Sequence, residues 1–150
     1  MDITPPPSVP KASSGPLRTA PTKDELGILG EQHAEAHLVA RGHIVLERRW
    51  RSRHGELDLI TLDDDVLVGV EVKTRRGLGY GHPFEAVTGV KLARLHRLLR
   101  EYAAQHPGVR VPLRIDVVAV LFPPGRRGAP ALAEAGLGVP QIEHLEDVRS

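Results

Sequence analysis

Two short apolar segments that follow each other in the chain carry side chains able to do acid and metal chemistry. Val, Ile and Leu alternate with other residues over 55–60 and again over 70–75, and three aspartates stand between them at 63–65. Period-two alternation around a polar turn is typical of a β-hairpin. We therefore expect two antiparallel strands in which alternate side chains share a face.

The polar side chains of these strands are expected to meet on one side of the hairpin. Glu56 and Asp58 share a face of the first strand, and Glu71 and Lys73 share a face of the second. Carboxylates a few ångströms apart share a proton or bind a cation, and their oxygens suit Mg²⁺ or Mn²⁺. Such an ion keeps room for phosphate oxygens, as phosphodiester hydrolysis requires. Lys73 would orient the attacking water or stabilise charge on the phosphate.

The order of these residues resembles the PD-(D/E)XK signature of the restriction-endonuclease-like superfamily. Asp58 is followed thirteen residues later by Glu71, Val72 and Lys73, although Leu57 stands where the signature has proline. The wider succession resembles the YraN-like family of uncharacterised bacterial proteins, which is similar to archaeal Holliday-junction resolvases. Its further motifs are Gly30-Glu31 with Ala34, then Pro83, Val87, Lys91 and Asp116-Val117-Val118. The resemblance covers roughly residues 24–122 and implies a metal-dependent nuclease.

The composition limits the functions that the chain can have. With 150 residues, 41% of them hydrophobic, one globular domain with a real core is expected. The lack of cysteine excludes disulfides, zinc–thiolate centres and thiol nucleophiles. Aromatic residues make up 3% and the net charge is +1, so nucleic acid would be bound by local basic patches. Because neither a membrane-length apolar run nor a secretory signal is present, we expect a cytoplasmic protein without a membrane partner.

The first helix is expected after a proline-rich tail at residues 1–22, which we predict to be disordered and either dispensable or partner-binding. Residues 23–150 would form a single nuclease-like domain. Thr22 and Glu25 have the spacing of a capping box that opens a helix ending at Gly42. On its inner face, Glu31 either supports the metal site or makes a structural ion pair.

The next predicted strand spans residues 43–50 and ends in a basic run at residues 48–54. The four arginines of this run either hold phosphates or form a solvated turn. Trp50 is predicted to plug the core rather than to stack on a base. Together with two later cations, the predicted nucleic-acid contacts are Arg48, Arg49, Arg51, Arg53, Arg75 and Lys91.

A glycine-rich loop at 74–82 is suited to closing over a substrate, and Pro83 is expected to begin a second long helix that His106 stops. Lys91 lies within the apolar stripe of that helix. A lysine is rarely buried alone, so Lys91 should meet a carboxylate or a phosphate, with snorkelling to solvent as the alternative.

The last part of the chain predicts a central strand at 113–122 and an edge strand at 141–145, joined by a loop at 123–140 to which we assign no function. Asp116 lies inside the central strand, and we expect it to anchor an arginine. The scattered histidines have no zinc-ligand spacing.

These expectations combine into an α/β fold with a restriction-endonuclease-like mixed sheet of four to five strands flanked by helices. The predicted catalytic residues are Asp58, Glu71, Lys73 and Glu31, and the predicted metal ligands are Asp58, Glu71 and the carbonyl near Val72. The leading function is a Mg²⁺- or Mn²⁺-dependent nuclease acting on DNA, with branched DNA as one candidate substrate. The alternative is a non-catalytic nucleic-acid-binding module. Resolution of junctions would require a homodimer.

Overall fold

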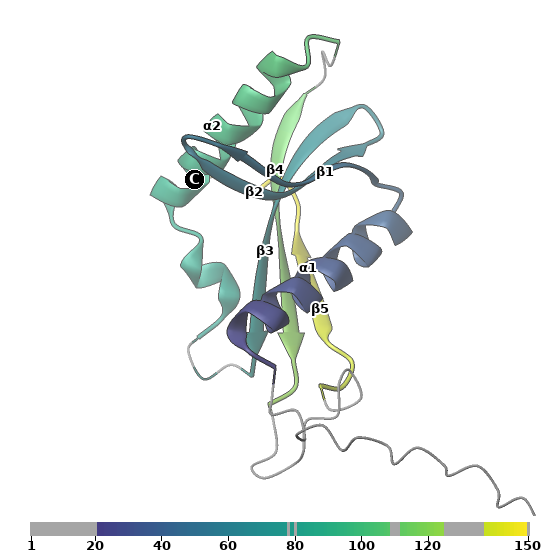
Figure 1. Ribbon diagram of the computed structural model, residues 1–150, viewed down its shortest axis with the longest axis vertical. Helices are drawn as coiled ribbons and strands as arrows, with labels where there is room; N and C mark the ends of the chain where they lie inside the picture. The colour runs from purple at the N-terminus through teal and green to yellow at the C-terminus, as the bar shows by residue number, and fades with distance from the viewer. Residues whose placement is uncertain (1–20, 78, 80, 109–111, 125–136, 150) are drawn as a thin grey trace, which may run out of the picture.

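A computed structural model describes residues 21–77, 79, 81–108, 112–124 and 137–149 (Figure 1). Most of the predicted proline-rich tail, part of the 74–82 loop and most of the 123–140 loop lie outside the described residues. The described elements form a five-stranded sheet with helices against it, which confirms the predicted α/β fold. Neither α-helix in these ranges is both long enough and apolar enough to pass through a lipid bilayer.

Helix α1, Lys23–Ala40, begins and ends where its capping residues predict. The Thr22 side chain accepts a hydrogen bond from the Glu25 N–H at 3.1 Å, and the Glu25 carboxylate accepts one from the Thr22 N–H at 3.3 Å. This reciprocal capping box satisfies two N–H groups that the first turn leaves open. Gly42 follows the helix with a φ of 96°, a left-handed conformation that glycine adopts without steric cost.

The sheet has the strand order β1-β2-β3-β4-β5 and is mixed. Each neighbouring pair is antiparallel except β3 and β4, which are parallel. A parallel pair needs a crossover, and the second helix supplies it between these two strands. The strands are β1 Ile44–Ser52, β2 Gly55–Asp63, β3 Val66–Arg76, β4 Leu113–Phe122 and β5 Gln141–Leu145. The predicted aspartate turn lies between β2 and β3, and β1 extends two residues beyond its predicted end.

The segment before the second helix differs from the prediction that one long helix begins at Pro83. Residues Pro83–Ala86 form a short 3-10 helix, η1, and the α-helix α2 spans Gly89–Gln105. Val87 between them has a ψ of 86°, which is not helical. The Thr88 side chain accepts a hydrogen bond from the Lys91 N–H at 3.3 Å and so starts a new helix. A proline favours the first turn of either helix type, whereas the threonine cap decides where α2 begins.

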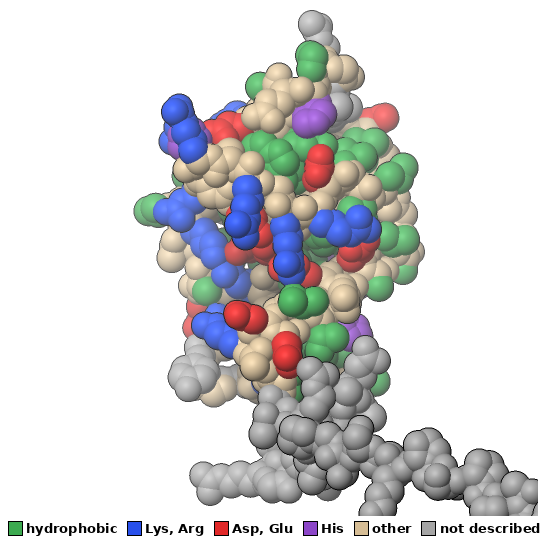
Figure 2. Space-filling view, in the orientation of Figure 1, with side chains coloured by type: hydrophobic (Ala, Val, Ile, Leu, Met, Phe, Trp, Pro, Cys, Tyr) green, Lys and Arg blue, Asp and Glu red, His purple; other side chains and the backbone are tan. Residues whose placement is uncertain are grey.

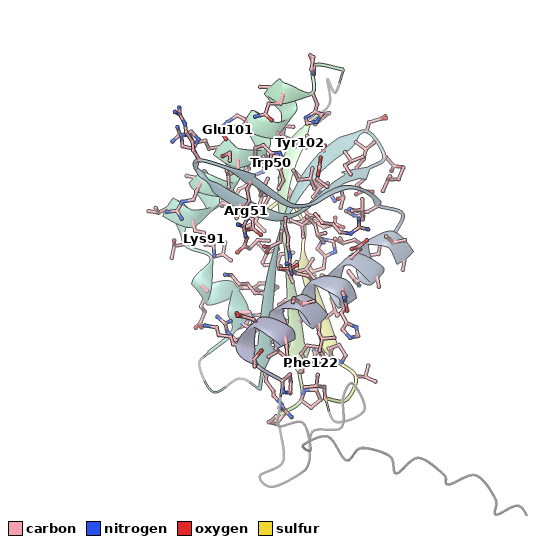
Figure 3. All side chains as sticks on the ribbon, viewed as in Figure 1. Trp50, Arg51, Lys91, Glu101, Tyr102 and Phe122 are labelled. Carbon is pink, nitrogen blue, oxygen red and sulfur yellow. The ribbon has the colours of Figure 1, made fainter. Side chains whose placement is uncertain are left out.

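Each face of the sheet is covered by one helix (Figure 1). Side chains of α1 pack with Val68 and Val70 of β3 on one face, and side chains of α2 pack with Leu67 of β3 on the other. Alternate residues of a strand point to opposite faces, so the two helices enclose the sheet from both sides. Trp50 packs against the second cluster, with its ring 5.6 Å from that of Tyr102 in a T-shaped contact, which confirms it as a core residue (Figure 3).

Asp116 is fully buried and organises a polar network within the sheet. It accepts hydrogen bonds from Arg114 at 2.9 Å, from His144 at 2.9 Å and from the Asp147 N–H at 3.0 Å. Arg114 also bonds to Asp63 at the end of β2, at 2.8 Å. The prediction that Asp116 anchors an arginine is confirmed. The network ties β2, β4 and β5 together at the end of the sheet where β3 begins.

Gly30 lies where α1 packs tightly against β3. A Cβ atom added there would lie 1.8 Å from Thr74 Oγ1, whereas one added at Gly27 in the same helix would meet nothing within 4 Å. We predict that Gly30→Ala lowers the free energy of unfolding by about 1–3 kcal/mol through overpacking. Gly27→Ala is the matched control and should raise it by about 0.5–1 kcal/mol through helix propensity. Urea denaturation measures both, and an equal gain in the two variants would contradict the close approach.

Candidate active site

The β1–β2 hairpin leaves the sheet at Asp58, and the candidate site lies at this parting. Strand β2 pairs with β3 from Leu59 to Asp63 but not before Leu59. Leu57 packs in the α2 cluster and Leu59 in the α1 cluster, although strict alternation would place both on one face. The strand therefore turns at Asp58. Its carboxylate accepts a hydrogen bond from the Val72 N–H of β3 at 2.7 Å, so a side chain bridges the strands where they separate.

Arg49 holds the hairpin in its bent form from the opposite strand. It lies between the residue pairs Arg48↔Leu59 and Trp50↔Leu57, which places it across from Asp58. Its φ of 50° is left-handed, a conformation that costs a non-glycine residue roughly 1–2 kcal/mol. Its guanidinium donates to the Glu31 carboxylate of α1 at 2.9 Å, so Glu31 makes the ion pair that was one of its two predicted roles.

Three other carboxylates act on Asp58 at this point. Burial, followed by the charge of Glu71 and then by the charges of Glu31 and Glu56, raises the pKa of Asp58, and its net value is about 7. The hydrogen bond from the Val72 N–H opposes these effects. The predicted convergence of acidic side chains is therefore present in the structure. Near neutral pH the Asp58 carboxyl is partly protonated, and a cation that binds there must displace the proton.

Glu71 lies between two ammonium groups and is almost fully buried. Its Oε1 atom is 3.2 Å from the Lys73 Nζ and 2.9 Å from the Lys91 Nζ. Lys73 comes from the same strand, two residues on, whereas Lys91 comes from the first turn of α2 (Figure 3). The expectation that Lys91 meets a carboxylate is confirmed. The sequence did not indicate which carboxylate, and the signal that Lys91 belongs to the site was its place in an apolar helical stripe.

Lys73 is an ammonium held against Glu71 at the point where the strands part. Burial lowers its pKa, and the neighbouring Lys91 lowers it further, against the attraction of Glu71. An ammonium in this position is suited to orienting a water molecule beside Glu71.

The basic residues predicted to bind phosphate are mostly paired with carboxylates of the chain itself. Figure 2 shows Lys and Arg side chains interleaved with acidic ones over the hairpin and the start of α2. Arg53 is exposed at the hairpin turn, and Arg75 donates to the Thr74 carbonyl at 3.1 Å. The paired arginines are Arg48 with Glu35, Arg49 with Glu31, and Arg51 with Glu56. A phosphate that binds to these arginines has to compete with a carboxylate.

The donor set fits a hard cation that brings its own water. Asp58 and Glu71 offer carboxylate oxygens close enough to shift a pKa, and Mg²⁺ is commonly held by one or two carboxylates with waters and phosphates completing its shell. Within the described ranges, no three His, Cys, Asp or Glu side chains are grouped as a complete metal site. The structure shows the Val72 N–H bonded to Asp58, and ligation by the Val72 carbonyl stays a prediction.

If the acidic pair holds a divalent ion, the raised pKa of Asp58 predicts how the affinity for that ion depends on pH. Because the carboxyl is protonated below about pH 7, Mn²⁺ affinity should rise by up to about tenfold per pH unit below pH 7 and level off above it. Calorimetric titration of Mn²⁺ between about pH 5.5 and 8.5 measures this slope. In Asp58→Asn the slope should flatten and the affinity fall. An affinity in the wild type that does not change over this range would contradict the assignment.

Comparison with known proteins gives relatives over most of the chain. The model of a family described as "Uncharacterised protein family UPF0102" matches residues 30–120, which contain the whole candidate site. A UPF0102 protein of Clavibacter michiganensis subsp. michiganensis is 52% identical over 103 residues, 69% of this chain and 87% of the relative. One of Arthrobacter sp. (strain FB24) is 46% identical over 127 residues, 84% of this chain and 97% of the relative. A UPF0102 protein of Kineococcus radiotolerans is 50% identical over 118 residues, which are 78% of this chain and 94% of the relative.

Proposed function

Since the chain belongs to the uncharacterised protein family UPF0102, its function has to be inferred from its own geometry, and we propose that it is a metal-dependent nuclease that hydrolyses phosphodiester bonds in DNA. The observation that carries the proposal is the pair of half-buried Asp58 and buried Glu71, which lies beside Lys73 where β2 and β3 part. We also propose that the chain belongs to the restriction-endonuclease-like superfamily. The strand order of the sheet and the acidic pair at the point where β2 and β3 separate support this membership.

Each residue of the site has a separate role in this mechanism. Asp58 and Glu71 would hold Mg²⁺ or Mn²⁺, which when bound supplies positive charge to the phosphate and lowers the pKa of a water. Lys73 would orient the attacking water and stabilise the negative charge that develops on the phosphate. Glu31 ties Arg49, which lies across from Asp58 in the hairpin, to α1 and so would act as a positioning residue for Asp58.

Nucleic acid would approach over the basic face of the hairpin and α2. Arg51, Arg53 and Lys91 lie on these elements, and guanidinium groups match phosphate oxygens in pairs of hydrogen bonds. Arg51 must exchange its Glu56 partner for phosphate, so the affinity for DNA should be modest and strongly dependent on salt. If the substrate is a DNA junction, two copies of the chain would be needed to make symmetric cuts.

A second candidate function is a nucleic-acid-binding module without catalysis. The observation that favours it is that Glu71 already has two ammonium partners, which neutralise it without a metal. Such a module would use the basic face alone. It predicts binding to DNA that is sensitive to salt and indifferent to divalent ions.

Cleavage of a panel of labelled DNAs separates the two functions. The panel holds duplex, single-stranded, flapped and four-way-junction DNA, each with Mn²⁺, Mg²⁺ or chelator. The nuclease predicts products that need metal and fall by about 10²-fold or more in Lys73→Ala, since one preorganised electrostatic group typically contributes that much. Lys23→Ala, at the exposed start of α1, is a matched control and should cleave as the wild type does. Binding without products under any metal would favour the module.

A further inference from the structure

One oxygen of Glu71 serves two ammonium groups, and they differ in how easily each can leave it. Lys73 is two residues from Glu71 on the same strand, and its side chain is 18% exposed. Lys91 belongs to α2, and its side chain is 32% exposed, against 10% for Glu71. A lysine has a flexible stem of four carbons, so the Lys91 ammonium can turn to solvent without any movement of the helix. Lys91 is therefore the partner that can be exchanged.

Lys91 also interacts electrostatically with both members of the acidic pair. Its Nζ atom lies 2.9 Å from the Glu71 Oε1 atom, and the charge of Asp58 attracts it as well. The Lys91 ammonium therefore offsets the negative charge of the same two carboxylates that offer oxygens to a divalent ion. The Lys91 ammonium and a metal ion bound to the same carboxylate oxygens would repel each other strongly. The reason is that charges in a partly buried site are screened less than charges in water.

We propose that Lys91 is an exchangeable internal cation that holds the acidic site in the metal-free protein and makes metal and DNA bind cooperatively. A divalent ion displaces the Lys91 ammonium from Glu71. The released ammonium then lies at the basic face, where a DNA phosphate can take it as a partner. By linkage, DNA that captures Lys91 must strengthen metal binding, and metal must strengthen DNA binding by the same factor. This inference rests on the proposed metal site and adds its regulation.

Calorimetric titration with Mn²⁺ alone tests the competition without any measurement of activity. Lys91→Met keeps the apolar stem and removes the charge. It should bind Mn²⁺ about tenfold or more tightly than the wild type, since a like charge a few ångströms from the ion is lost. Lys91→Arg, which keeps the charge, should bind Mn²⁺ as the wild type does. Arg94→Met removes one charge from the next turn of α2 and should change the affinity less than about twofold.

The same titration in the presence of a phosphorothioate DNA duplex tests the coupling. In the wild type the duplex should tighten Mn²⁺ binding several-fold, and in Lys91→Met this gain should vanish while the protein keeps its thermal unfolding transition. Equal or weaker Mn²⁺ affinity in Lys91→Met would overturn the inference and leave the nuclease proposal standing. If Glu71→Gln and the wild type bind Mn²⁺ with equal affinity, the assignment of Glu71 as a metal ligand is wrong, and the proposed function is contradicted as well.

Discussion

Replacing Glu71 with glutamine is expected to abolish metal-dependent cleavage while DNA binding is kept. Glutamine has nearly the shape of glutamate but lacks the charge that attracts a divalent ion, and it leaves Lys73 and Lys91 side by side around a neutral amide. We expect the single-turnover rate to fall by about 10²–10³-fold or more, the scale on which one preorganised electrostatic group acts. DNA affinity should stay the same or rise, because one negative charge is removed from the basic face.

A substitution of the same type away from the site is the control for Glu71→Gln. Glu47 is a half-buried glutamate of β1 on the same hairpin, and Glu47→Gln removes one negative charge without entering the acidic pair. Its cleavage rate should stay within about twofold of the wild type, because Glu47 has no part in holding the metal or the attacking water. If Glu71→Gln cleaves DNA as fast as the wild type, the acidic pair has no role in the mechanism.

The second large effect is expected on stability, from a residue that takes no part in the chemistry. Asp116→Asn should lower the free energy of unfolding by about 3–5 kcal/mol, because it leaves Arg114 without its buried charged partner. Urea denaturation of the two proteins measures the difference. Asp64→Asn in the exposed β2–β3 turn is a matched control. Asp64 has a φ of 49°, which asparagine tolerates well, so its effect should stay within about 0.5 kcal/mol.

The Asp116 network also has a predictable dependence on pH. Burial alone would raise the pKa of Asp116, but hydrogen bonds from His144 and Arg114 outweigh it and hold the pKa below its ordinary value. A carboxyl with a lowered folded-state pKa stabilises the fold above its unfolded pKa, near 3.9, and loses this contribution as the pH falls through the lowered value. The stability gap between wild type and Asp116→Asn should therefore narrow below about pH 4. A gap that is constant down to about pH 2 would contradict the network.

Local signals in the sequence were sufficient for most of the fold. The capping box at Thr22 and Glu25 and the alternation around the aspartate turn involve residues within a few positions of each other, so their geometry follows from short-range sterics and hydrogen bonds. Pro83 shows the limit of such signals. It is compatible with the first turn of either helix type, and the Thr88 side chain five residues later decides where α2 starts.

The candidate site was predicted in its residue types but not in its connections. Period-two alternation placed Glu71 and Lys73 together, and the structure has them in contact. The contact of Lys91 with Glu71 depends on how α2 is set against β3, which the helical stripe alone does not specify. The bend at Arg49 and Asp58 breaks the alternation itself, because a left-handed residue interrupts the strand. No local sequence pattern indicated that His144 would be a partner of Asp116.

The most direct test of the account is where a divalent ion binds. Crystals of the full chain grown with Mn²⁺, with anomalous differences measured at the manganese absorption edge, locate the ion without reference to activity. We predict one strong peak at about 2.0–2.3 Å from an oxygen of Asp58 and an oxygen of Glu71, with the Lys91 ammonium moved away from Glu71. If no peak lies there at saturating Mn²⁺ and both lysines still contact Glu71, the acidic pair is not a metal site and the nuclease proposal is contradicted.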